Sequence, residues 1–225
     1  MRTAHIRPGA RRAGRRRRML ALACLVPFVL AACGTGTGTD RPPVKISAPT
    51  SDLHGTRIGT PLREPDLTLT GTTGRPVNLI KATQGKLTLV YFGYTHCPDV
   101  CPTTMADLAG ALRLLTPEQR ARIAVVFITT DPWRDTPKVI KAWLASFNPS
   151  FIGLTGDYTK IQTAAKSLGI ALERPSSMSG EYEVTHGAQV LPFGGDHRAH
   201  VIYTAGVSAK EFAADLPKLL QEDDG

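Results

Sequence analysis

Cysteine is scarce in this sequence of 225 residues, with four in total. Cys24 and Cys33 lie in or beside an N-terminal apolar segment, so Cys97 and Cys101 alone remain for the rest of the chain. Two cysteines four positions apart cannot form the disulfide framework that stabilises small secreted domains. The pair is therefore either one local bridge or a functional site.

Acidic residues are absent from residues 1–32, which contain eight arginines. The net charge of +8 comes from this segment, because the other 19 basic residues are matched by 19 acidic ones. The rest of the chain thus lacks the basic excess expected of a nucleic-acid-binding domain. We therefore expect no nucleic-acid partner.

A long hydrophobic run is also absent. The apolar segment at residues 19–32, about 14 residues long, is too short to span a bilayer comfortably. It follows the arginines and ends in LAACG, an arrangement typical of an export signal. Residues 30–34 resemble the lipobox of bacterial lipoproteins. We expect residues 1–32 to be a lipoprotein signal peptide and Cys33 to be lipidated, which would anchor the protein on the extracytoplasmic face of the cell membrane.

Residues 33–58 are rich in Gly, Thr, Pro and Ser. Such a segment buries too little apolar surface to order itself, so it is expected to be a flexible tether in which His54 is solvated. Residues 59–225 are expected to form one domain.

The pattern of this domain predicts an α/β fold with a central mixed sheet flanked by helices. Alternating or continuous apolar runs predict strands, and helical spacing with turn residues predicts helices. The helix from residue 137 has Thr136 as its expected N-cap. The expected elements are a hairpin at 66–79, strands at 86–92, 123–128 and 151–155, helices at 103–115, 137–147 and 157–168, strands at 182–193 and 200–203, and a helix at 209–220.

Cys97 and Cys101 follow a buried strand and precede a helix. If both lie near the first helical turn, they are about 6 Å apart along the axis and share a face. This separation permits either a disulfide or a shared thiophilic metal ion. The positive end of the helix dipole is expected to lower the pKa of both thiols. The spacing leaves redox cycling and metal binding open.

Two thiolates leave a metal ion under-coordinated, so a third donor is expected further along the chain. The candidates are His96, His186, His197, His200 and Met105. His96 is expected to point away from its neighbour Cys97, and Met105 is expected in the core. His197 lies in a turn and His200 begins an outer strand, positions that favour solvated or structural roles. His186 precedes Gly187 after a short alternating segment, where it can face the cysteines.

Three motifs resemble those of the SCO/SenC family of copper-binding, thioredoxin-like proteins. Residues 91–104 read YFGYTHCPDVCPTT, residues 131–137 read DPWRDTP and residues 151–156 read FIGLTG. The resemblance runs from about residue 59 to 220. It implies a thioredoxin-like fold with an N-terminal hairpin and a C-terminal hairpin insertion. It also implies that Cys97, Cys101 and His186 bind copper, although Thr185 stands where the family usually has an acidic residue.

The same resemblance implies a metallochaperone that delivers copper to the CuA centre of cytochrome c oxidase subunit II. Another periplasmic-type copper chaperone is a further expected partner. Two alternatives remain, a thiol-disulfide oxidoreductase acting on the CuA cysteines and a copper or redox sensor. The three residues between the cysteines, instead of the usual two, favour metal binding over general redox work. The donor set itself also suits zinc.

Asp131 and Asp135 follow the end of a central strand, where open α/β sheets place their sites. They are therefore candidates for a supporting shell around the metal. Loop and helix-capping roles are the alternative.

Overall fold

The computed structural model describes residues 52–178 and 182–223. The expected signal peptide, the lipidation site Cys33 and most of the expected tether lie outside these residues. None of the described helices is long and apolar enough to cross a membrane.

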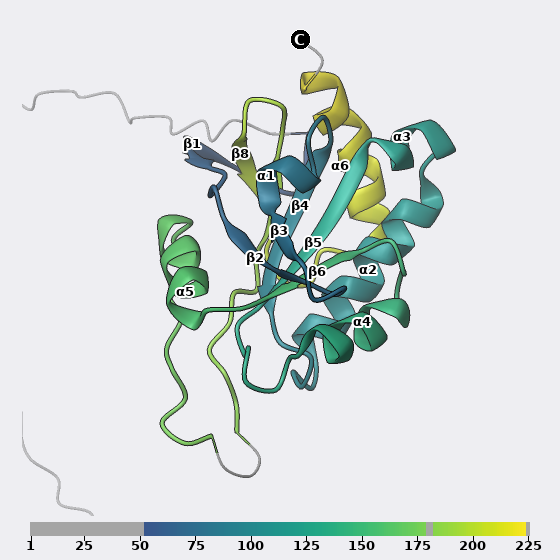
Figure 1. The fold of residues 1–225 in the computed structure, drawn as a ribbon. Coiled ribbons are helices and arrows are strands. Elements are labelled where there is room, and N and C mark those ends of the chain that lie inside the picture. Colours follow the sequence, from purple (N-terminus) through teal and green to yellow (C-terminus); the bar gives the residue numbers. More distant parts are fainter. Residues whose placement is uncertain (1–51, 179–181, 224–225) are drawn as a thin grey trace, which may run out of the picture. The chain divides into compact units, whose positions relative to one another are not determined.

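The centre of the fold is a mixed six-stranded sheet in the order β3-β2-β6-β5-β4-β7 (Figure 1). Strands β4, β5 and β6 are parallel, whereas β7 and β2 run antiparallel to their neighbours β4 and β6. A second sheet pairs β1 with β8. The strands are β1 (Thr56–Arg63), β2 (Thr68–Gly71), β3 (Pro76–Asn78), β4 (Leu87–Gly93), β5 (Ile123–Thr129), β6 (Ile152–Thr155), β7 (Val190–Phe193) and β8 (Arg198–Ile202).

Helices cover both faces of the sheet. Side chains at alternate positions of β4 point to opposite faces, so Leu89 joins a core with α2, α4 and α6, whereas Val90 joins a core with α5. Figure 1 shows α2, α4 and α6 on one side and α5 on the other. The helices are α1 (Leu79–Ala82), α2 (Val100–Leu114), α3 (Pro117–Ala121), α4 (Pro137–Ala145), α5 (Tyr158–Ser167) and α6 (Ala209–Glu222). This arrangement confirms the expected fold class.

Local sequence signals explain most of the boundaries. Thr136 caps α4 through a hydrogen bond from Val139 N, as predicted, and Pro137 occupies the first helical turn. Asp157 caps α5 in the same way. Ser208 and Glu211 form a capping box at the start of α6. Helices α4, α5 and α6 therefore begin where a capping side chain satisfies the first free amides.

The short helices α1 and α3 were not predicted, and two further regions differ from the sequence prediction. Strand β1 begins at Thr56, inside the stretch expected to be a tether, because its backbone pairs with β8. His54, expected to be solvated, instead contacts the buried carboxylate of Asp215 through Nδ1 at 2.9 Å. The expected strand at 182–193 is also shorter, since only Val190–Phe193 pairs with β4. The described residues from 182 to 189 form a loop instead.

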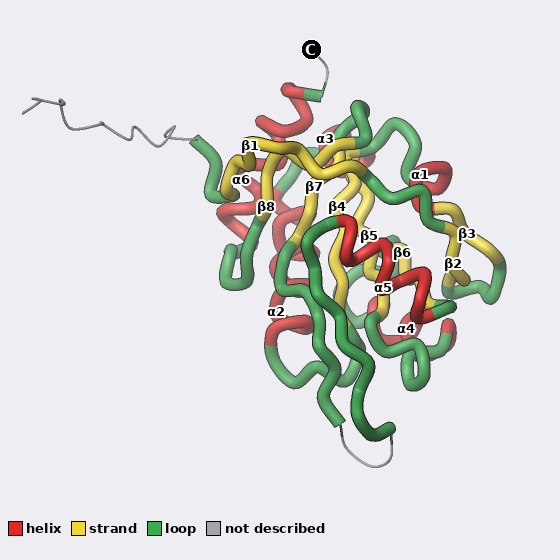
Figure 2. Tube along the Cα trace, turned by 90° about the vertical axis from the view of Figure 1, so that its left-hand side faces the viewer, coloured by secondary structure: helices red, strands yellow, loops and turns green. Residues whose placement is uncertain are grey.

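This loop belongs to the long connection between α5 and β7. Figures 1 and 2 show its described limbs running out past the end of the sheet near the start of α2. The parallel strands β4 and β5 have their carboxyl ends at this end of the sheet. Because the cysteine loop follows β4, the connection approaches that loop.

Candidate metal centre

Strand β4 leads directly to the two cysteines. It lies between β5 and β7 and is buried throughout. A short loop follows, in which Cys97 N donates to the Tyr94 carbonyl at 3.2 Å. Cys97 precedes α2, and Cys101 is the second residue of that helix. Both thiols are free, and both residues are buried.

The first turn of α2 uses a sulfur where most helices use a capping oxygen. The Asp99 side chain makes no capping hydrogen bond. Instead, Cys101 N lies 3.4 Å from Cys97 Sγ and donates to it. This hydrogen bond from a free amide of the first helical turn holds the Cys97 sulfur close to Cys101.

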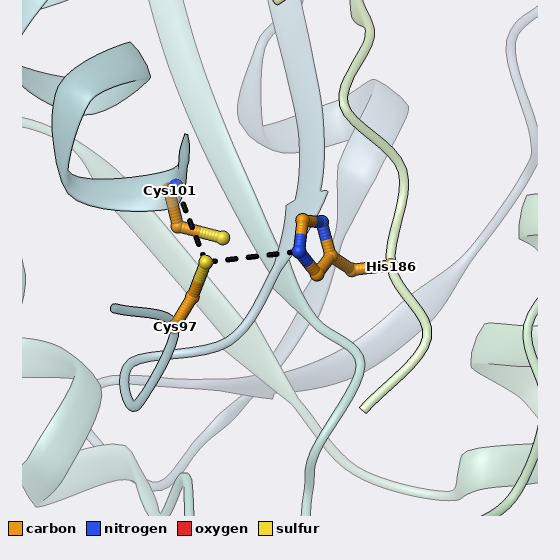
Figure 3. A group of neighbouring side chains, drawn as sticks. All are labelled: Cys97, Cys101 and His186. Atoms are coloured by element: carbon orange, nitrogen blue, oxygen red, sulfur yellow. Dashed lines mark hydrogen bonds between the residues drawn. The ribbon is translucent and has the colours of Figure 1, made fainter. Parts of the chain in front are cut away.

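His186 approaches this pair from a separate segment (Figure 3). Its Nε2 lies 3.6 Å from Cys97 Sγ, and its Nδ1 lies 2.8 Å from the Gly187 carbonyl oxygen. A carbonyl oxygen only accepts, so Nδ1 carries the proton in the neutral ring and Nε2 presents its lone pair. The Tyr94 ring packs against the imidazole at a centroid distance of 5.3 Å. His186 is therefore held in the tautomer that a metal ligand requires.

The three donor atoms meet the simplest test for a metal site. One ligand atom each from Cys97, Cys101 and His186 lies within 4.8 Å of the others. The donors are two soft sulfurs and one imidazole nitrogen, a set suited to copper or zinc. The structure thus brings together the residues that the sequence singled out.

The electrostatics of Cys101 differ from the sequence prediction. Burial raises the pKa of the Cys101 thiol to about 12, although a hydrogen bond donated by Tyr91 Oη, 3.4 Å from Sγ, acts in the opposite direction. Desolvation therefore outweighs the helix dipole that was expected to lower this pKa. Without a metal ion the thiol is neutral at pH 7, so metal binding must displace a proton.

Asp131 and Asp135 lie outside the donor cluster and bind the two loops around it. The buried Asp135 carboxylate accepts hydrogen bonds from Thr95 N at 2.9 Å and Thr95 Oγ1 at 2.5 Å, just before Cys97. The buried Asp131 pairs with Arg134 and accepts from Tyr182 Oη at 3.0 Å, just before His186. Through these contacts, Asp135 binds the loop that carries Cys97, and Asp131 binds the loop that carries His186.

The other predicted donor candidates lie elsewhere. His96 is half exposed, and its Nδ1 lies 3.1 Å from Thr95 Oγ1. His197 and His200 pair with Glu64 and Asp196, so His197 is less isolated than its position in a turn suggested. Met105 is fully buried in the core, as expected.

Tyr91 and Gly93 are among the residues of the site that were not identified from the sequence. Tyr91 donates to Cys101, and Gly93 leaves space for the cysteine, because a Cβ there would lie 2.8 Å from Cys101 Sγ. A sequence signal was available for Tyr91. Alternation along β4 places its side chain on the same face of the sheet as those of Leu87 and Leu89. Gly93 had no such signal, because its importance depends on a tertiary contact.

A family model described as SCO1/SenC matches residues 57–221. A putative copper-binding protein of Stutzerimonas stutzeri is 34% identical over 142 residues, which cover 62% of this chain and 69% of that protein. This chain matches a smaller share of other curated relatives, for one of them 35% of that protein's length.

Solved structures agree with the fold. The ScoI protein of Bradyrhizobium japonicum with copper bound is 34% identical, with a TM-score of 0.60 over 72% of this chain and 99% of that one. BsSco, described as a member of the Sco family of cytochrome c oxidase assembly proteins and as having a disulfide switch, is 19% identical, with a TM-score of 0.58. The match covers 74% of this chain and 98% of the BsSco chain. At this identity it supports the fold alone.

Proposed function

The chain belongs to the SCO1/SenC family, and on that premise we propose that it binds copper through Cys97, Cys101 and His186. The observation that carries the proposal is the convergence of two thiols and one imidazole within 4.8 Å. Thiolates stabilise Cu(I), and the imidazole adds affinity for Cu(II). Zinc fits the same donors, so the copper-bound relative is what favours copper.

Copper is then the cargo of the protein. Its acceptor is the CuA centre of cytochrome c oxidase subunit II, as the resemblance to SCO/SenC proteins implies. Three protein donors leave room for an incoming thiolate, so the ion can pass to a partner by ligand exchange. A second copper chaperone outside the cytoplasm would load the site.

The same cysteines support a second activity, thiol-disulfide exchange. In the described structure both are reduced, and the Cys97 sulfur faces the Cys101 amide at 3.4 Å. Oxidation would remove two electrons and two protons from the thiols and form one S–S bond, which eliminates both thiolate ligands. Reduction of a CuA-domain disulfide by metal-free protein tests this activity, and an absence of turnover would leave delivery as the function. A copper or redox sensor would use the same coupling.

Membrane attachment is proposed through Cys33, which follows the apolar segment of the expected signal peptide. A Cys33→Ser variant should move from the membrane fraction to the soluble fraction and should no longer incorporate labelled lipid. Retention in membranes without the label would contradict lipidation at this residue.

Copper titration of the reduced protein under anaerobic conditions tests the ligand assignment. His186→Ala should weaken Cu(II) binding at least about 100-fold, because even residues that only support a ligand are worth 10–100-fold. Cu(I) affinity should fall less, since two thiolates remain. His200→Ala is the matched control, because that histidine is half exposed and pairs with Asp196. Equal Cu(II) affinities for His186→Ala and the parent would refute the assignment.

A further inference from the structure

His186 occupies a segment without regular structure. The loop at residues 182–189 pairs with no strand before Val190. In this loop His186 contacts the neighbouring Gly187 carbonyl, Cys97 Sγ and the Tyr94 ring. A ligand on such a loop needs support from elsewhere if its imidazole is to stay in position before a metal ion arrives.

Tyr182 provides that support, four residues before His186. The guanidinium carbon of Arg134 lies 3.6 Å from the centroid of the Tyr182 ring, and Arg134 Nη2 donates to the Tyr182 carbonyl at 3.0 Å. The Tyr182 hydroxyl donates to Asp131 Oδ1 at 3.0 Å. Arg134 Nε in turn donates to Asp131. The ring, carbonyl and hydroxyl of Tyr182 are thus all bound by two residues.

These two residues belong to a firmly held segment. Asp131 is fully buried, two residues after the end of β5, and its backbone amide donates to Thr129 Oγ1 at 2.9 Å. Asp135 N donates to the Asp131 carbonyl at 2.9 Å. Because Asp135 also binds Thr95 in the cysteine loop, the segment at residues 129–137 contacts both the cysteine side and the histidine side of the site.

We infer that Arg134 is a positioning residue for the metal centre, which holds the His186 loop against the cysteine loop by clamping Tyr182. This inference rests on the proposed role of His186 as a ligand. A second contact supports it, since Arg134 also lies 5.9 Å from the Tyr94 ring, which packs against the imidazole. The planar guanidinium is essential to this arrangement, because it stacks and donates at the same time.

Amide hydrogen exchange of the reduced, metal-free protein tests the clamp directly. Arg134→Ala should accelerate exchange in residues 182–189 by about tenfold and leave the amides of α2 unchanged. Arg120→Ala is the control, because Arg120 lies in α3, where its Nη2 donates to the Leu115 carbonyl at 3.1 Å. Parental exchange rates in the Arg134→Ala loop would overturn the inference.

Cu(II) affinity supplies a second readout through a double-mutant cycle. Arg134→Ala alone should raise the dissociation constant about tenfold, as expected for a residue that orients a ligand. In a His186→Ala background the same change should have no further effect. Fully additive losses would mean that Arg134 does not act through His186, and the inference would fail.

The two proposals fail differently. If His186→Ala leaves Cu(II) affinity unchanged, the ligand assignment is wrong, while hydrogen exchange still decides whether Arg134 orders the loop. If Arg134→Ala unfolds the protein, seen as lost protection in α2, Tyr182→Leu replaces it, because that variant keeps the ion pair between Arg134 and Asp131. Tyr182→Leu should give the same faster exchange, and unchanged exchange would again overturn the inference.

Discussion

Tyr91 makes the surroundings of Cys101 different from those of Cys97. Its ring is fully buried, and its hydroxyl donates to Cys101 Sγ at 3.4 Å. Burial is also the main cause that raises the pKa of Tyr91 above its ordinary value, so the hydroxyl keeps its proton and remains a donor. The hydrogen bond favours the reduced sulfur, because a disulfide sulfur is a poorer acceptor.

The variant Tyr91→Phe tests this effect. Loss of a hydrogen bond worth about 1 kcal/mol should lower the reduction potential of the Cys97–Cys101 couple by about 20 mV. Equilibration of the metal-free protein with glutathione or dithiothreitol buffers measures the change. Tyr158→Phe is the control, since the Tyr158 hydroxyl is buried and has no hydrogen-bond partner within the described part of the chain. A potential unchanged or raised in Tyr91→Phe would contradict this account of the hydrogen bond.

At the scale of elements, the sequence predicted those structures whose residues carry their own signal. Strands β4 and β5 are continuous apolar runs that are buried along their whole length. Helices α4 and α5 begin at side-chain caps that can be identified from sequence. The cysteine pair and His186 were likewise identified from motifs. These features required no knowledge of a distant partner.

The features that were missed depend on distant contacts. Strand β1 has mostly exposed residues and no apolar alternation, and its pairing with β8 joins segments far apart in sequence. The alternation at residues 182–185 resembles a strand, yet Tyr182 binds Arg134 instead of a neighbouring strand. Positions of this kind follow from tertiary packing, which overrides local pattern.

The contact between β1 and the turn before β8 provides a pH-dependent element of stability. The Glu64 carboxylate at the end of β1 is almost fully buried, and burial raises its pKa despite the hydrogen bond from His197 Nδ1 at 2.6 Å. Its other oxygen, Oε1, is buried without a hydrogen-bond partner among the residues that the structure describes. A raised folded-state pKa means that the native state favours the protonated carboxyl. This contribution is complete below the ordinary pKa of 4.5 and is lost as the pH rises through the folded pKa.

We therefore expect Glu64→Gln to gain stability relative to the parent as the pH rises from about 4 toward 7. Urea denaturation at several pH values measures the difference in free energy of unfolding. The control is Glu173→Gln, the same substitution at an exposed side chain. A difference that moves in favour of the parent as the pH rises would show that ionisation of Glu64 stabilises the fold.

At the scale of the whole molecule, Asp215 joins the described start of the chain to its last helix. The carboxylate is fully buried in α6 and accepts hydrogen bonds from His54 N at 2.6 Å, Gly55 N at 3.2 Å and Tyr203 Oη at 3.1 Å. An acidic residue between Phe212 and Leu216 on the buried face of a helix is itself a sequence signal of such a role. The network fixes where the chain enters the domain, which is also where the proposed membrane tether would end.

Removal of this carboxylate should destabilise the domain without altering the metal centre. In Asp215→Ala the buried donors lose their acceptor, so we expect the free energy of unfolding to fall by about 3 kcal/mol. Glu222→Gln is the control on the same helix, because its exposed ion pair with Arg57 should contribute less than about 1 kcal/mol. Denaturant unfolding gives both values, and copper stoichiometry under native conditions should match the parent. A loss as small as that of the control would mean that the segment at 52–55 is held in place without the Asp215 carboxylate. A loss of copper binding in the folded variant would instead mean that this end of the domain is coupled to the site.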